Sequence, residues 1–251
     1  MIDSCRSTDI TIEKSRTCNQ MQTLPATHVI LFDIDGTLIS SHMSELDERK
    51  RYLDAFREVT GMELRVDPSR FAGMVDPQIC KIILAENGIG SALVESYLPK
   101  VLSKMAAAYR DMPKQLELNR GVRALLELLS RSTNYVLGIL TGNLSVIASE
   151  KLIATGIRPY FKEAFYADNY DDRNRLVQDA VTICLSKYSL LNTRDEIIIG
   201  DTPLDVKAAR AANATAIAVA SGVYSMDALS QTGATITVRD LTPTNELLSA
   251  I

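Results

Sequence analysis

Two aspartates stand one residue apart, directly after a run of four apolar residues. The run is Val29-Ile30-Leu31-Phe32, and Asp33-Ile34-Asp35-Gly36-Thr37-Leu38 follows it. An apolar run of this length that ends in a carboxylate predicts a strand buried on both faces, as in a parallel sheet covered by helices. Open α/β sheets bind their ligands at the carboxyl ends of such strands, where paired carboxylates suit metal-assisted chemistry better than packing. The first expectation is therefore an enzyme.

Two further buried-strand patterns also end in polar residues. The apolar stretch 135–140 runs into Thr141-Gly142-Asn143, and the stretch 196–200 runs into Asp201-Thr202-Pro203. Because parallel strands share a direction, we expect Asp33, Thr141 and Asp201 to gather along one edge of the sheet.

Carboxylates brought together in this way repel one another unless they share a cation. An all-oxygen set of ligands, completed by water, suits Mg²⁺, so Asp33, Asp35 and Asp201 predict a magnesium site. Asp205 lies four residues after Asp201, on the same side of the first turn of the next predicted helix. It could bind the metal directly or orient groups that do, and Thr202 is a supporting candidate beside it.

The stretch after the second strand predicts an anion site. The hydroxyl of Thr141 and the backbone N–H groups from Gly142 and Asn143 onward open the next helix, and the glycine permits a close approach by a phosphate. A basic partner comes from the helix predicted over 173–187, which offers Arg173 and Arg175. Arg173 falls on the inward apolar stripe of that helix and is favoured, whereas Arg175 points to the solvated face. Both could still be ordinary surface arginines.

The chain divides into an alternating α/β core and a helical insert. Residues 28–38 and 113–251 alternate strand and helix patterns, whereas 39–112 show only helical spacing, with a helix over 91–109 that we expect to break or kink at Pro99. The fold class expected is a Rossmann-like parallel sheet with helices on both faces, plus an all-helical cap domain over the site. Residues 1–27 read as a loosely ordered extension. Asn119 is the expected N-cap of the helix over 121–129.

Composition excludes several classes of partner. The chain has 251 residues, 46% of them hydrophobic, and a formal net charge of -4. It therefore offers no basic surface for nucleic acid or for an anionic membrane, and a small molecule is the expected partner. No apolar segment approaches a membrane span, so we expect a cytoplasmic protein. With His28 and His42 as the two histidines, carboxylates must carry the chemistry.

The ordered set of motifs closely resembles the haloacid dehalogenase (HAD) superfamily. The resemblance rests on Asp33-Ile34-Asp35-Gly36-Thr37, then Leu140-Thr141-Gly142-Asn143, then the basic helix, and then Gly200-Asp201-Thr202-Pro203-Leu204-Asp205. It covers residues 29 to about 241 and implies a Rossmann-like core with the first strand in the centre. It departs from the commoner pattern at the basic residue, where most members have lysine and this chain has arginine.

The resemblance also implies a role for each residue. Asp33 would be the nucleophile that takes the phosphoryl group as an aspartyl-phosphate, and Asp35 would protonate the leaving group and later activate water. Asp33, Asp35 through its backbone carbonyl, and Asp201 would hold Mg²⁺, while Thr141 and Arg173 would bind the phosphoryl oxygens. Dehalogenases of the superfamily lack an acid at the position of Asp35, so its presence favours phosphatases.

Three functions are compatible with these motifs. The leading one is a magnesium-dependent phosphatase for a small phosphomonoester; the others are a mutase resembling β-phosphoglucomutase and a catalytically idle phosphate-binding protein. The segment 71–79, with Gly73 and Asp76, resembles the specificity loop of phosphoglycolate-phosphatase-like members, and it could equally be a plain turn before a helix. No oligomeric state is favoured by the sequence.

Overall fold

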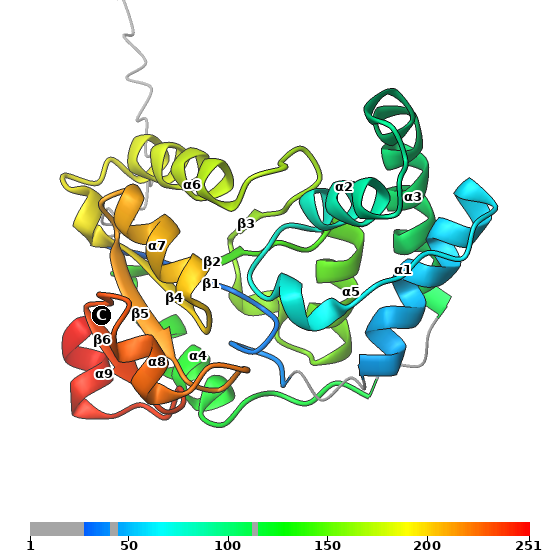
Figure 1. Cartoon of the computed structure of the whole chain (residues 1–251). Coiled ribbons are helices and arrows are strands. Elements are labelled where there is room, and N and C mark those ends of the chain that lie inside the picture. Colours follow the sequence, from blue (N-terminus) through cyan, green and yellow to red (C-terminus); the bar gives the residue numbers. More distant parts are fainter. Residues whose placement is uncertain (1–27, 41–44, 112–114) are drawn as a thin grey trace, which may run out of the picture.

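The protein, seen in a computed structural model that describes residues 28–40, 45–111 and 115–251, is built around one six-stranded parallel sheet (Figure 1). The expected extension 1–27 lies outside the described residues. Strand order is β3-β2-β1-β4-β5-β6, so the strand that precedes Asp33 is central. The strands are β1 His28–Phe32, β2 Tyr135–Leu140, β3 Glu163–Phe165, β4 Glu196–Gly200, β5 Thr215–Val219 and β6 Ile236–Val238.

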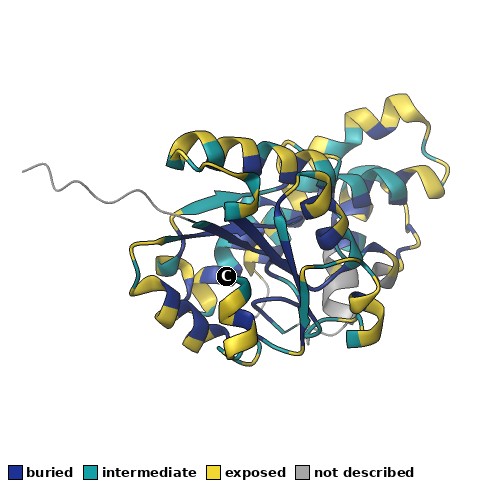
Figure 2. Ribbon diagram, turned by 90° about the vertical axis from the view of Figure 1, so that its left-hand side faces the viewer, coloured by how far each residue is buried: buried dark blue, intermediate teal, exposed yellow. Residues whose placement is uncertain are grey.

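Helices cover both faces of the sheet, as predicted. On one face α4 (Val122–Ser130), α5 (Ser145–Ala154) and α9 (Asn245–Ala250) pack against alternate strand residues such as Ile30 and Ile199. On the other face α6 (Arg173–Tyr188), α7 (Pro203–Ala211) and α8 (Met226–Ser230) pack against the intervening ones. The central strands are consequently buried on both sides, while the outer faces of the helices remain exposed (Figure 2). This is why these strands are continuous apolar runs.

A helical insert follows β1 and has its own apolar core. It contains α1 (Glu45–Thr60), α2 (Asp76–Glu86) and α3 (Ser91–Asp111), which lie together to one side of the sheet (Figure 1). Its buried cluster includes Phe56, Ile83 and Met105 and is separate from the two clusters that flank the sheet. The insert thus agrees with the predicted cap. Over the described residues, no helix combines the length and the apolar character that a membrane span requires.

Two local predictions need correction. Of the break or kink expected at Pro99, the break is absent: α3 is one continuous helix from Ser91 to Asp111, and Val94 and Val101, on either side of the proline, are both buried in the cap core. Asn119 does not cap α4, which begins after Gly121 instead. The amide of Asn119 donates to the backbone carbonyls of Gly36 (2.9 Å) and Thr37 (3.0 Å) and so fastens the turn that carries the first motif.

Other helix ends follow the sequence closely. Asp172 caps α6 by accepting from the backbone N–H of Arg175, and α7 begins with Pro203 in its first turn. Gly156, with φ of +68°, follows the end of α5 in the left-handed conformation that ends many helices. The short helix α9 and the 3-10 turn η1 (Pro68–Phe71) were not expected.

A buried carboxyl group lies at the end of the sheet opposite to Asp33. Glu196, the first residue of β4, is fully buried, and burial raises its pKa from an ordinary 4.5 to about 8. Because the folded-state pKa lies above the unfolded one, the folded protein binds the extra proton. Below about pH 4.5 the buried carboxyl group therefore costs no stability. The free energy of unfolding falls as the pH rises from 4.5 to about 8, where the folded protein also loses the proton.

We expect Glu196→Gln to raise the free energy of unfolding at pH 8 to 9 by roughly 2–5 kcal/mol, because the variant has no buried carboxylate to ionise. The gain should vanish as the pH is lowered toward 4.5, the ordinary carboxyl pKa. Urea unfolding at a series of pH values measures this, with Glu127→Gln on the exposed face of α4 as the control. A variant less stable than the parent at every pH would contradict the expectation.

Candidate active site

Three polar residues lie side by side where the central strands end. Phe32 of β1 pairs with Ile139 of β2 and with Ile199 of β4, so the residues that follow these strands reach the same edge of the sheet. Asp33, Thr141 and Asp201 are all buried there. The structure thus brings together the three strand ends that sequence reasoning grouped.

Asp33 is held by the arginine that the sequence favoured. Arg173, in the first turn of α6, donates to Asp33 Oδ1 at 3.1 Å and to the carbonyl of Leu140 at 3.4 Å. Burial raises the pKa of Asp33 to about 7; Arg173 opposes the shift, while Asp205 and Asp35 add to it. The exposed Arg175 pairs instead with Asp179 on its own helix (3.3 Å), which separates the two candidate arginines.

Arg173 also contacts Asp205, in the first turn of the helix that follows β4. Its Nη2 pairs with the buried carboxylate of Asp205, and although burial lowers its pKa, Asp205 and Asp33 raise it above the ordinary value. Its Nε is buried and, within the part of the chain that the structure describes, has no hydrogen-bond partner. A buried donor beside Asp33 is suited to an incoming phosphoryl oxygen.

Asp201, at the end of β4, is also almost completely buried. Burial raises its pKa well above the ordinary value, and the charges of Asp33 and Asp205 raise it further, while the hydroxyl of Thr37 donates to it at 3.2 Å. Thr202 is the N-cap of α7 and forms a reciprocal capping box with Asp205. Asp205 thus contacts both Arg173 and the start of α7.

The donor set fits a small hard cation of the magnesium type. Like charges and burial disfavour ionised Asp33 and Asp201, and a shared divalent cation would reverse both effects. The described residues contain no cluster of three or more His, Cys, Asp or Glu side chains arranged around a metal. Mg²⁺ commonly uses one or two carboxylates with water and substrate phosphate, so two carboxylates and a backbone carbonyl suffice.

The anion site at the start of α5 differs from the expectation. The hydroxyl of Thr141 accepts from the backbone N–H of Asn143 at 3.3 Å. The N–H groups of Leu144 and Ser145 already donate to carboxylates, namely Asp76 (3.0 Å) and Asp168 (2.8 Å). The helix opening is therefore largely satisfied by the protein itself, which leaves Thr141 and Arg173 as the stronger candidates for phosphate.

The cap segment with Gly73 and Asp76 is docked on the core. A Cβ at Gly142 would lie 2.2 Å from the carbonyl oxygen of Met74, and one at Gly73 would lie 2.4 Å from Thr202 Oγ1, so both contacts need glycine. Asp76 is buried, accepts from Tyr52 (2.9 Å) on α1, and donates through its N–H to the carbonyl of Gly142 (2.8 Å). Its side chain joins cap and core, a role that its specificity-loop interpretation did not include.

A residue missed by sequence reasoning, Lys151 on α5, contacts Asp35. Its ammonium lies 2.6 Å from Asp35 Oδ1 and 2.5 Å from Oδ2, and Asn143 Nδ2 donates to Oδ2 at 3.0 Å. A detectable signal did exist: Lys151 interrupts the apolar stripe Ile147, Ala148 and Leu152 of its helix. A charge on a stripe that faces the core indicates a buried partner.

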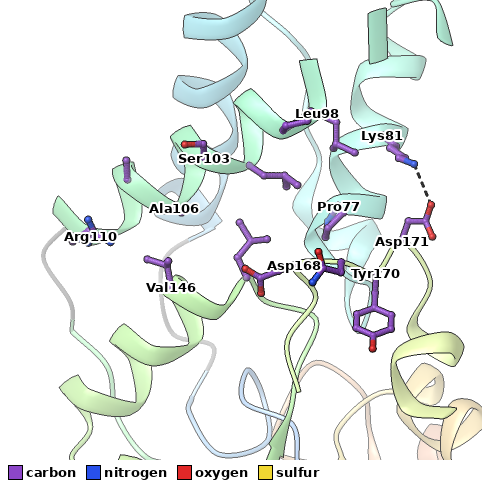
Figure 3. A pocket seen from close by; sticks show the side chains of 15 residues that line it. Pro77, Lys81, Leu98, Ser103, Ala106, Arg110, Val146, Asp168, Tyr170 and Asp171 are labelled. Atoms are coloured by element: carbon purple, nitrogen blue, oxygen red, sulfur yellow. Dashed lines mark hydrogen bonds and ion pairs between the residues drawn. The ribbon is translucent and has the colours of Figure 1, made fainter. Parts of the chain in front are cut away.

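A cavity of about 700 Å³ lies at the junction of cap and core (Figure 3). Leu98, Ala106 and Arg110 of α3 line one side, and Val146 and Asp168 line the other. Lys81 and Asp171 close one end with an ion pair of 3.1 Å. Its lining does not include the strand-end residues Asp33, Thr141 or Asp201.

Comparison with known proteins shows the family of this chain. The sequence pattern of the haloacid dehalogenase-like hydrolases matches residues 30–219. A phosphoglycolate phosphatase from Nitrosococcus oceani is 27% identical over 197 residues, which cover 77% of this chain and 84% of the relative.

Solved structures share the fold. A hydrolase from Pseudomonas syringae has 24% identity and a TM-score of 0.68, covering 90% of this chain and 99% of its own. A haloacid dehalogenase-like hydrolase from Streptococcus pneumoniae has 20% identity and a TM-score of 0.61, covering 88% and 97%. The predicted superfamily, fold class and phosphatase-like enzyme type are confirmed, and the chain belongs to the haloacid dehalogenase-like hydrolase family.

Proposed function

We propose that the protein is a magnesium-dependent phosphatase that hydrolyses a small-molecule phosphomonoester through an aspartyl-phosphate on Asp33. The observation that carries this proposal is the pairing of buried Asp33 with Arg173, whose Nε points to no partner among the described residues. A nucleophile and a phosphate-binding cation thus share one buried site. The kinship with a phosphoglycolate phosphatase supports the same class of substrate.

Each side chain has a separate task in the proposed reaction. Asp33 attacks phosphorus in line, while Arg173 and Thr141 hold the equatorial oxygens. Asp35, whose side chain is 35% exposed, is the acid for the departing ester oxygen. It gives a proton to that oxygen and later takes one from the attacking water.

Mg²⁺ would be held by the carboxylates of Asp33 and Asp201 and by the backbone carbonyl of Asp35, and when bound it supplies positive charge to the transferring phosphoryl group. The protein contributes the dry environment in which this charge has its largest effect. The cap segment contacts Gly142 and Thr202 next to the site, and a cap at this place favours a small metabolite over a phosphorylated protein.

Asp33→Asn should abolish phosphate release from 4-nitrophenyl phosphate and from a metabolite panel that includes 2-phosphoglycolate. The loss should be at least about 10³-fold in kcat, because the amide cannot act as the nucleophile. Excess EDTA should have the same effect on the parent protein, reversed by Mg²⁺. Asp227→Asn, at an exposed position in α8, is the control and should retain activity. Equal phosphate release by Asp33→Asn and the parent would refute the proposed nucleophile.

Substitution of the two arginines should separate their roles. Arg173→Met should lower kcat/KM by about 10²-fold or more, since a charge-assisted contact to the transferring group is lost. Arg173→Lys should restore part of it, because lysine keeps the charge without the planar fork. Arg175→Met should leave steady-state kinetics unchanged. If Arg175→Met were the damaging variant, the assignment from the contacts would be wrong.

Product analysis separates the competing functions. A mutase resembling β-phosphoglucomutase would convert a phosphosugar to its isomer without net release of phosphate. An idle binding protein would release none, yet its melting temperature would rise with Mg²⁺ and a fluoride mimic of phosphate. Stoichiometric phosphate release from at least one ester favours the phosphatase over both.

A further inference from the structure

The ammonium of Lys151 lies between the first motif and the cap. The Lys151 side chain is 3% exposed, although it carries a charge. Besides both oxygens of Asp35 it contacts Asn143 Oδ1 at 2.7 Å, and the ring of Tyr109 on α3 lies 5.7 Å away. Three oxygen acceptors match the three N–H donors of an ammonium.

Burial of this lysine is costly, and its neighbours offset the cost. A lysine on the inward face of a helix loses the hydration of its charge, whereas a methionine at the same place has no charge to desolvate. An ion pair offsets this loss only when its geometry is good. Here the contacts to Asp35 and Asn143 are short, and the ammonium lies over the ring of Tyr109. An apolar residue would pack at lower cost, so the position of the charge relative to Asp35 calls for a functional reason.

We propose that Lys151 is a positioning residue that holds the carboxyl group of Asp35 in the orientation needed for proton transfer at the ester oxygen. The inference rests on the proposed phosphatase function and deepens it. Lys151 and Asn143 both contact the carboxyl group, and the Asp35 side chain is still 35% exposed. Tyr109 adds a link to the cap, because its ring covers the ammonium from α3.

The chemistry leaves Lys151 unchanged. As the bond from Asp33 to phosphorus forms and the ester P–O bond breaks, the leaving oxygen takes the proton of Asp35. In the second half, water attacks phosphorus, the bond to Asp33 breaks, and Asp35 recovers a proton from that water. The ammonium neither gains nor loses a proton; it fixes the direction from which the proton is delivered.

Two aryl esters of similar shape test the proposal. The leaving group of 4-nitrophenyl phosphate departs with little help from a proton, whereas that of phenyl phosphate needs it. Lys151→Met should therefore lower kcat/KM for phenyl phosphate by at least about 10-fold more than for 4-nitrophenyl phosphate, a part of the 10²–10⁴-fold typical of general acid catalysis. The ratio of the two values does not depend on how much of the variant folds.

Matched variants complete the experiment. Lys151→Arg should restore part of the ratio, and Lys151→Met added to Asp35→Ala should cause no further change, because Lys151 acts through Asp35. Lys187→Met is the control, since Lys187 also has a carboxylate partner, Glu163 (2.6 Å), and an aromatic neighbour, Tyr188 (5.6 Å), but at the other end of the sheet.

The outcomes distinguish this inference from the function on which it rests. An equal loss on both esters in Lys151→Met, or an additive loss in the double variant, overturns the positioning role while the phosphatase stands. If the parent protein with Mg²⁺ releases phosphate from neither ester nor from the metabolite panel, the proposed function fails and the inference falls with it.

Discussion

The structure depends on the gathering of like charges in a place that water scarcely reaches. Asp33, Asp201 and Asp205 converge at the carboxyl edge of the central strands, and each is almost completely buried. Their mutual repulsion and their lost hydration are opposed mainly by Arg173, which touches two of the three. Such an arrangement destabilises the fold, and it makes the site strongly attractive to a cation.

The rest of the molecule holds these charges in register. The parallel ladders align the ends of β1, β2 and β4, and apolar clusters on both faces keep them from shifting. The cap contributes through specific contacts. Asp76 bridges Tyr52 to the start of α5, and Tyr109 of α3 lies over Lys151, which contacts Asp35. Cap position and the first motif are thereby physically connected.

Much of this could be predicted because local signals and tertiary structure agreed. A buried parallel strand is a continuous apolar run in the sequence, and the residue that follows it lies at the carboxyl edge of the sheet. For this reason the sequence could predict that Asp33, Thr141 and Asp201 lie together. The inward stripe of α6 likewise separated Arg173 from Arg175. Both predictions needed only the spacing of apolar residues and the shared direction of parallel strands.

The contacts that the sequence did not predict have a common physical cause: each polar group bonds to a partner that is distant in the sequence. Asn119 is a good N-cap by type, yet the carbonyls of Gly36 and Thr37 take its amide. Asp76 and Asp168 satisfy the N–H groups that opened α5, so that helix opening offers a phosphate less than its local sequence suggested. Lys151 was overlooked because its partner Asp35 lies 116 residues away. Spacing along the chain carries no information about such pairings.

The central claim is that Asp33 itself receives the phosphoryl group. Acid quenching of the protein during turnover of a substrate with Mg²⁺, followed by peptide mapping by mass spectrometry, tests it most directly. We expect one phosphoryl group on the peptide that contains Asp33, absent when the substrate is omitted. Phosphorylation of a different residue, or an enzyme that turns over while this peptide stays unmodified at every quench time, would contradict it.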